Sequence, residues 1–269
     1  MQWAFDVARI ALTLPFMIYA SASDYKNREV SNSVWILFAP PAFALTFMEL
    51  FLFNTSEFVS YGLSFGLTVV FALVLFYAGG FGGADAKALM CLALALPFYP
   101  ENLLVPLSGE VSPISKVFFP LAIFSNSVVL AVVPVLWIVL RNALWHSKTS
   151  RNLFEGDQRF ESLGKRLLVM ITGYKVPISK LKEKWHVYPL EDIEETPEKG
   201  VKRKLIVLPK DEGRPAIVGR LDKAITAGAI EDGVWASPGL PMLVLITVGL
   251  VVALFFGDII WLFVNSLFG

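Results

Sequence analysis

The sequence has almost none of the residues from which soluble proteins build disulfides and metal sites. Its 269 residues include one cysteine, Cys91, which excludes a disulfide framework and a cysteine-based zinc site. Only two histidines occur, and no His-x-x-x-His or His-Glu-x-x-His pattern is present, so no metal centre is predicted. Charged residues are also scarce, at 17%, against about 25% in an average soluble domain. These shortages argue against an ordinary soluble enzyme.

The charges that are present balance. Lysine plus arginine and aspartate plus glutamate both number 23, so no global basic field exists that would attract nucleic acid. The one glycine-rich run, residues 79–83, is not followed by the Lys-Ser/Thr pair of a phosphate-binding loop. The sequence therefore predicts no nucleotide, no metal and no other cofactor.

Long apolar runs dominate the chain, with 55% hydrophobic residues and a mean hydropathy of +0.62. A helix needs about 20 predominantly apolar residues to cross about 30 Å of hydrocarbon. We therefore expect an all-α polytopic membrane protein with six transmembrane helices, of which the fourth is short. The six predicted spans are residues 3–20, 34–53, 58–78, 84–99, 117–140 and 240–263.

Basic residues cluster in one part of the chain. Eighteen of the 23 lysines and arginines lie between Arg141 and Lys223, which indicates a polar domain set into a membrane protein. The predicted organisation is transmembrane helices 1–5 in residues 1–140, a small α+β insert in residues 141–236, and the last transmembrane helix in residues 237–269.

Within the insert, two short segments are rich in β-branched and aromatic residues and are predicted strands, residues 185–190 and 204–208. Residues 191–203 are acidic and then basic, which is typical of a solvated loop. Residues 215–227 are a predicted helix, with a proline in its first turn and Gly228 just past its end.

Basic residues near the span ends predict the orientation in the membrane. Six spans place the loop after the first span, the glycine-rich turn and the insert on one side. Lys26, Arg28, Arg141 and Lys148 lie near the membrane on that side, and the positive-inside rule makes it cytoplasmic. We expect a multi-pass protein of the cell membrane with its insert in the cytoplasm.

Four charged residues lie within or near the outer ends of the predicted spans. Asp6 and Arg9 are three residues apart on a helix and are expected to pair with each other. Glu49 and Asp258 are expected to be solvated by lipid headgroups.

Two aspartates fall at the predicted cytoplasmic boundary. Asp24 follows the first span and Asp85 opens the fourth. Taken singly, Asp24 could be a solvated turn residue and Asp85 a helix cap. The glycines before Asp85 favour a site, because they let another backbone approach and allow positive φ angles. Two aspartates can share one proton and hydrolyse a peptide, one as base toward a water and the other as acid.

Two segments resemble one known family. Gly82-Gly83-Ala84-Asp85 is similar to the Gly-x-Gly-Asp motif of membrane aspartyl proteases, with Ala84 in place of the second glycine. Asp24–Asn32 is similar to the other half of the type IV prepilin peptidase signature, with Ser31 where many bacterial members have proline. The whole chain resembles the archaeal prepilin and preflagellin peptidases of the GxGD class.

The resemblance implies an aspartyl endopeptidase with Asp24 and Asp85 as its catalytic pair. It implies substrates like preflagellin and type IV prepilins, cut at the cytoplasmic face after a short basic leader that precedes a hydrophobic helix. The bilayer is then the second partner, and no cofactor is needed. The N-terminal Cys-x-x-Cys loop of the bacterial enzymes is absent, which implies peptidase activity without methyltransferase activity.

Residues near the two aspartates are candidates for substrate binding or for shaping the site: Gly82, Gly83, Ala84, Lys26, Lys87 and Asn32. The two lysines have two interpretations. Either they are cytoplasmic membrane anchors, or one of them tunes a nearby aspartate by its charge.

Two other functions are compatible with the span pattern. A six-span transporter or channel subunit with a regulatory cytoplasmic domain would use intramembrane acids as ion sites. It would favour repeated halves and spans interrupted at the midplane, which the sequence lacks. A presenilin-like protease would place its first acid in mid-span, whereas Asp24 lies at a span end.

Overall fold

The computed structural model describes residues 1–196, 200–207 and 213–268. The chain forms two compact units, Met1–Ala131 with Pro241–Gly269, and Val132–Leu240. Each unit has its own hydrophobic core and is described by itself. The fold is mostly helical with a small sheet-containing region, as the sequence predicts.

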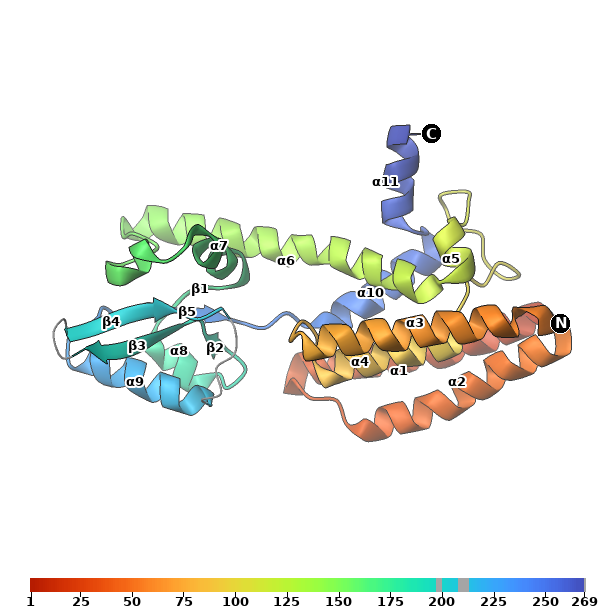
Figure 1. The fold of residues 1–269 in the computed structure, drawn as a ribbon, viewed down its shortest axis with the longest axis horizontal. Coiled ribbons are helices and arrows are strands. Elements are labelled where there is room, and N and C mark those ends of the chain that lie inside the picture. The colour runs from red at the N-terminus through yellow and green to blue at the C-terminus, as the bar shows by residue number, and fades with distance from the viewer. Residues whose placement is uncertain (197–199, 208–212, 269) are drawn as a thin grey trace. The chain divides into compact units, whose positions relative to one another are not determined.

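The first unit is built from apolar helices (Figure 1). Its elements are α1 (Gln2–Asn27), α2 (Asn32–Phe53), η1 (Thr55–Glu57), α3 (Phe58–Tyr77), α4 (Gly83–Ala95), α5 (Pro113–Val117), the start of α6 (Phe119–Thr149), α10 (Met242–Phe255) and α11 (Ile259–Phe268). The Ser31 hydroxyl begins α2 by accepting a hydrogen bond from the Ser33 N–H at 3.3 Å, a helix cap of the usual kind.

Among the described helices, α1, α2, α3 with η1, and α6 are each long and apolar enough to cross a membrane. Helices α10 and α11 could form one further span, bent by 53° at the break between them. The predicted fourth span corresponds to α4, which has only 13 residues. At a rise of about 1.5 Å per residue it is about 20 Å long, short of the hydrocarbon thickness. The six-span count therefore stays a prediction.

Helix α4 lies at the centre of the first unit. It packs against α1, α2, α3 and α10, and Ala88, Leu89 and Leu92 on it are almost completely buried. Its many alanines let the neighbouring helices approach closely. Thr46 of α2 donates a hydrogen bond of 2.7 Å to the Leu94 carbonyl in the last turn of α4. A short helix enclosed in this way is held rigidly, which matters because α4 begins at the site described below.

The expectation of headgroup solvation for Glu49 and Asp258 is wrong. Arg9 pairs with Asp6, as predicted, but also with Glu49 at 2.8 Å, and all three side chains are buried. Asp258 is 5% exposed, and its Oδ1 accepts the Ile260 N–H at 3.0 Å at the start of α11. A buried carboxylate needs such partners, because the membrane interior offers it no water.

The second unit contains the end of α6 and a small α+β region. Its other elements are η2 (Gly156–Phe160), α7 (Leu163–Thr172), β1 (Tyr174–Val176), α8 (Ile178–Glu183), β2 (Tyr188–Pro189), β3 (Glu191–Thr196), β4 (Gly200–Leu205), α9 (Arg214–Thr226) and β5 (Val234–Ser237). Strand β5 lies between β1 and β2 in an antiparallel sheet, while β3 and β4 form a separate antiparallel pair. Trp235 on β5 is fully buried and stacks on Phe154.

The predicted helix over 215–227 is confirmed as α9, and Gly228 after it has φ +69°. The predicted strands are found in part, as β2 and as the end of β4; Leu208 lies outside the described residues. The predicted loop over 191–203 is wrong for its described residues, because 191–196 and 200–203 contribute to the β3–β4 pair.

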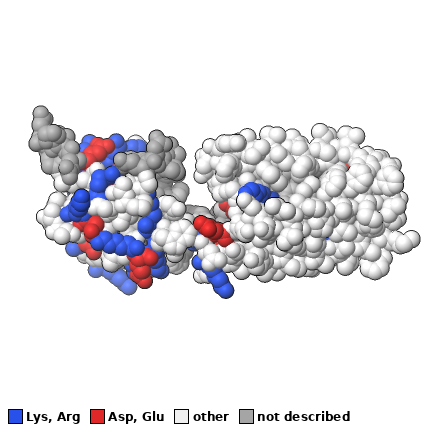
Figure 2. Space-filling model, turned by 90° about the horizontal axis from the view of Figure 1, so that it is seen from below, with Lys and Arg blue, Asp and Glu red and all other residues white. Residues whose placement is uncertain are grey.

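Charge pairing explains why the acidic and basic run forms strands. Asp192 lies opposite Lys204, and Glu194 lies opposite Lys202. Opposite charges facing each other across two strands stabilise a sheet. The charge pattern that suggested a solvated loop is therefore the complementary pattern of a strand pair. In Figure 2 the coloured side chains gather on the unit that carries this pair, and the apolar unit is almost entirely white.

Candidate active site

Asp24 lies in the last turn of α1. The helix ends at Asn27, and Arg28 follows in the left-handed conformation, with φ 55°, so that its N–H donates to the Asp24 carbonyl at 2.9 Å. Ser23 donates a hydrogen bond of 2.7 Å to the Glu29 carbonyl and closes the turn. The Asp24 side chain is partly buried and interacts electrostatically with Arg28. Asp24 is thus on a helix end whose turn is fixed by its own backbone.

Asp85 lies in the first turn of α4. Its Oδ2 accepts a hydrogen bond of 2.9 Å from the Gly82 N–H, which caps the helix. The side chain is partly buried. The N-cap residue of α4 is Gly82, so Asp85 is not the N-cap that the sequence allowed. Its side chain instead bonds back to the N-cap from the third helical position, which fixes the position of the carboxylate. The helix N-terminus stabilises a negative charge at this point.

The structure brings Asp24 and Asp85 together. Helices α1 and α4 pack against each other, and the charge of Asp24 acts on the Asp85 carboxyl. Carboxyl groups whose charges interact repel each other when both are ionised, which favours a state with one proton on the pair. The arrangement can supply a base and an acid to one bound water and one carbonyl group.

Lys87 contacts neither aspartate directly, and its ammonium donates instead to the Asn32 side-chain oxygen at 2.7 Å. This bond joins the first turn of α4 to the first residue of α2. Lys26 lies in the last turn of α1 with an exposed side chain. The sequence singled out Lys87 and Asn32 separately, and nothing in their spacing predicts that they bond to each other.

Gly82 and Gly83, the two glycines nearest Asp85, do not serve to provide a positive φ angle. Gly82 has φ −72° and Gly83 is the first residue of α4, so positive φ is required at neither; in this run it occurs at Gly79, with φ +75°. A Cβ at Gly82 would lie 3.2 Å from Asp85 Oδ2. A Cβ at Gly83 would lie 3.7 Å from the Phe76 ring, an ordinary contact. Gly82 therefore leaves room for the Asp85 cap.

Ala84 is partly buried and packs against the core of the first unit. It is the small residue that replaces the second glycine of the motif.

An apolar groove of about 420 Å³ lies between α1 and α2. The two serines on either side of Asn32 form part of its wall, so the groove reaches the start of α2. Its lining is Pro15, Phe16, Tyr19, Ser31, Ser33, Val34 and Leu37.

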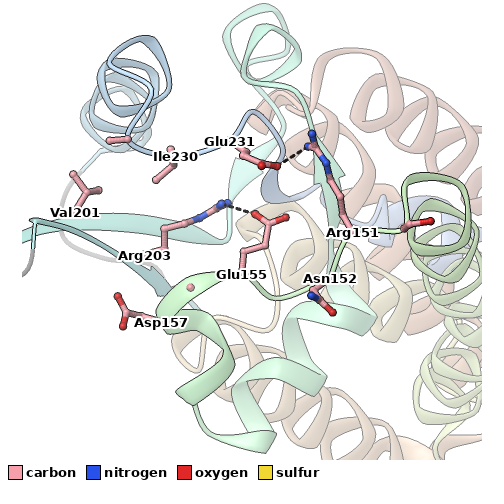
Figure 3. Close-up of a pocket in the computed structure, with 11 residues that line it drawn as sticks. Arg151, Asn152, Glu155, Asp157, Val201, Arg203, Ile230 and Glu231 are labelled. Carbon is pink, nitrogen blue, oxygen red and sulfur yellow. Dashed lines mark hydrogen bonds and ion pairs between the residues drawn. The ribbon is translucent and has the colours of Figure 1, made fainter.

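A second pocket, also of about 420 Å³, lies in the other unit (Figure 3). Its charged groups pair with one another: Arg203 bonds Glu155 at 2.8 Å, and Arg151 bonds Glu231 at 2.9 Å. Burial lowers the pKa of the neighbouring Lys175 ammonium to about 8. Most of the charged groups in this pocket are thus paired with one another, and Asp157, which also lines it, is exposed, so Asp24 and Asp85 remain the better candidate site.

No group of three or more potential metal ligands of the His, Cys, Asp and Glu types is found within the described ranges.

The first unit has helices long enough to cross a membrane, and it carries two carboxyl groups at the ends of helices that pack together. These features are typical of a membrane-embedded peptidase. Comparison with known families supports this class. Residues 11–138 match the type IV leader peptidase family, and residues 165–259 match the family described as archaeal peptidase A24 C-terminus type II. The chain is therefore similar to leader peptidases over both matched ranges, and this likeness favours a protease over a transporter.

Three relatives cover nearly the whole chain, and each is a preflagellin peptidase. That of Methanococcus voltae is 27% identical over 257 residues, covering 92% of this chain and 94% of the relative. That of Methanocaldococcus jannaschii is 24% identical, covering 94% and 95%. That of Methanococcus maripaludis is 21% identical, covering 90% and 92%. The likeness therefore extends through both units.

Proposed function

We propose that the protein is a membrane aspartyl endopeptidase with Asp24 and Asp85 as its catalytic residues. It removes the short basic leader from preflagellin and type IV prepilin-like proteins at the cytoplasmic face of the cell membrane. The observation that carries the proposal is the convergence of two partly buried aspartates from α1 and α4. The likeness to the type IV leader peptidase family and to the three preflagellin peptidases supports the reaction and the substrate class.

In the proposed reaction the two carboxyl groups hold one proton between them. The ionised carboxylate takes a proton from a water, and the water oxygen attacks the scissile carbonyl carbon. The protonated carboxyl gives its proton to the carbonyl oxygen, forming a neutral diol. As the diol collapses, the C–N bond breaks and the carboxyl that gained the water's proton passes it to the leaving amine. The other carboxylate takes back a proton from one diol hydroxyl, so that the new C-terminal carboxyl group forms. The pair ends with one proton, as it began, and no cofactor takes part.

The surrounding residues position this chemistry. The Gly82 N–H holds one oxygen of Asp85, leaving the other free to act on water. The bond between Lys87 and Asn32 ties the start of α4 to the start of α2, close in sequence to both aspartates. Lys87 is then a positioning residue, while Lys26 is a membrane anchor.

The groove between α1 and α2 fits the hydrophobic part of such a substrate. Its lining is mostly apolar, and it reaches Ser31 and Ser33 at the start of α2. A substrate helix lying in the groove would bring the residues that precede it toward Asp24, since that aspartate and Ser31 flank the same short loop. The basic leader would then extend past the membrane surface, where the positive-inside pattern places the cytoplasm.

Cleavage of a preflagellin by the purified protein tests the proposal. The full chain in lipid nanodiscs is incubated with a preflagellin, and the products are sized by mass spectrometry. We expect a single product shortened by its basic leader. A matched substrate with the leader's lysines and arginines changed to glutamine should be cut more slowly. An intact preflagellin after incubation with folded protein would contradict the proposed function.

A further inference from the structure

Helix α7 presents its apolar side outward. Leu163, Leu167 and Leu168 are 70%, 55% and 44% exposed. They lie on one face of the helix with Ile171, which is partly buried. Just before the helix, Phe160 in η2 is 87% exposed. A helix of a water-soluble domain normally turns such a stripe toward the core.

The opposite side of α7 holds the helix in place. Val169 is fully buried and packs in a cluster with Leu205 and Trp235. The Asn142 side-chain amide of α6 donates to the carbonyl oxygens of Met170 and Gly173, at 2.9 and 2.8 Å. The outward direction of the leucines is therefore fixed by contacts within the unit.

Helix α9 of the same unit has the usual orientation and is a useful contrast. Its apolar residues Ile217, Val218 and Leu221 are buried in the core, and its arginines and lysine lie on other faces. An outward-facing apolar side is thus a property of α7 that α9 of the same unit does not share.

The chain around α7 carries an excess of positive charge. Between residues 141 and 166 there are six lysines and arginines against three aspartates and glutamates. Arg159 is exposed beside Phe160, and Lys165 is partly exposed on the helix, where it pairs with Glu161 at 3.0 Å. An outward apolar face next to cations is the pattern of a helix that lies in the interface of a membrane with anionic lipids.

We propose that α7 is an interfacial membrane helix. Its face of Leu163, Leu167, Leu168 and Ile171 inserts among the lipid headgroups, and Arg159 and Lys165 attract anionic headgroup phosphates. The insert is then a membrane-attached domain and not a freely soluble one. The inference does not depend on the proposed peptidase activity.

The neighbouring helix α6 indicates that lipid, and not a second protein, covers the apolar face of α7. This helix is itself long and apolar enough to cross a membrane. Trp137, Leu140 and Leu144 near its C-terminal end are exposed, and Trp145 and Lys148 follow. Tryptophan and lysine at the end of an apolar helix are typical of the membrane–water boundary. Because α6 bonds directly to α7 through Asn142, this boundary and the outward leucines lie close together.

A single fluorescent label on α7 tests the proposal. In the full chain with Cys91 changed to alanine, Leu167→Cys and, as a control, Lys180→Cys on α8 are labelled with the environment-sensitive dye NBD. Both positions are exposed, so neither label disturbs the core. In nanodiscs of phosphatidylcholine with phosphatidylglycerol, the label at position 167 should shift to the blue. A lipid carrying a shallow nitroxide quencher should dim it several-fold, and the label at position 180 should change little.

Two double variants separate the insertion of the leucines into lipid from the attraction of the cations to anionic headgroups. Leu163→Gln with Leu168→Gln should return the label at 167 toward its spectrum in water, and Arg159→Gln with Lys165→Gln should weaken quenching mainly when phosphatidylglycerol is present. A label at 167 that stays in water in both lipid mixtures would overturn the proposal. A label protected from water but untouched by the lipid quencher would also overturn it, because a second copy or another protein would then be the occupant.

Discussion

The Lys87 ammonium donates a hydrogen bond of 2.7 Å to the side-chain oxygen of Asn32. Lys87 lies two residues beyond Asp85, and Asn32 begins the helix that follows the turn after Asp24. One bond thus ties α4, which carries Asp85, to the start of α2, the helix that follows the turn after Asp24. Lys87 therefore bonds to the side-chain amide of Asn32 and not to the carboxylate of either aspartate.

We expect Lys87→Met and Asn32→Leu each to slow cleavage by about two- to ten-fold, the effect of losing one hydrogen bond worth about 0.5–1.5 kcal/mol. The double variant should be no slower than the slower single one, because both remove the same bond. Lys87→Arg, which keeps a donor, should retain more activity than Lys87→Met. Additive losses in the double variant, measured as kcat/KM, would show that the two residues act separately.

Gly82 and Gly83 should respond differently to the same substitution. Gly82→Ala places a Cβ 3.2 Å from Asp85 Oδ2 and disturbs the cap, so we expect cleavage to fall about ten-fold or more. Gly83→Ala meets only the Phe76 ring at 3.7 Å and should be nearly neutral. Ala84→Gly should be tolerated as well. Equal cleavage rates for the two alanine variants would contradict the role assigned to Gly82.

Much of the first unit could be predicted from its sequence, because long apolar runs form helices in most contexts. The prediction that Asp24 and Asp85 lie near each other came from topology, since six spans would place both helix ends on one side of the membrane. Hydropathy could not give the length of α4. Its alanine-rich core continues in sequence into the apolar residues around Pro97, so the helix ends earlier than the apolar run does.

The errors in the second unit and at the outer helix ends have one cause. Local charge suggested water at residues 191–203 and at Glu49, whereas several described charges there pair with residues that are not their neighbours in the sequence. Asp192 pairs with Arg220 of α9, and Glu49 pairs with Arg9 of α1. Arg203, for example, bonds the buried Glu191 at 2.6 Å. Such partners lie outside any local window, and so does the bond between Lys87 and Asn32.

Arg9 pairs with two buried carboxylates, so its removal should destabilise the first unit. Arg9→Met leaves Asp6 and Glu49 buried without a cation, at a cost of about 3–5 kcal/mol. Adding Asp6→Asn and Glu49→Gln should restore most of the loss, since no uncompensated charge remains. Thermal unfolding in detergent compares the single and triple variants. A triple variant no more stable than Arg9→Met would contradict this explanation.

The buried Lys175 should make the second unit more stable at alkaline pH. In the folded protein the pKa of the Lys175 ammonium falls from 10.5 to about 8, and burial is the largest cause. Between these values the unfolded chain binds more protons than the folded one, so stability rises with pH across that window, and below about pH 8 the full penalty remains.

The matched variant Lys175→Met removes this titration. Its unfolding midpoint should exceed that of the natural protein most at about pH 7, and the difference should shrink by about pH 10. A difference that does not change with pH would show that Lys175 is not the titrating group.

The central claim is that Asp24 and Asp85 perform the cleavage as a pair. Its most direct test is the rate of preflagellin cleavage by Asp24→Asn and by Asp85→Asn, with Asp157→Asn, an exposed position in η2, as the control. Asparagine keeps the shape, and at position 85 its side-chain oxygen can still accept the Gly82 N–H, so folding should be preserved. We predict that each single variant loses more than the roughly 10²–10⁴-fold assigned to one acid–base group, while the control cleaves normally. Cleavage at a near-normal rate by either Asp24→Asn or Asp85→Asn would contradict the account.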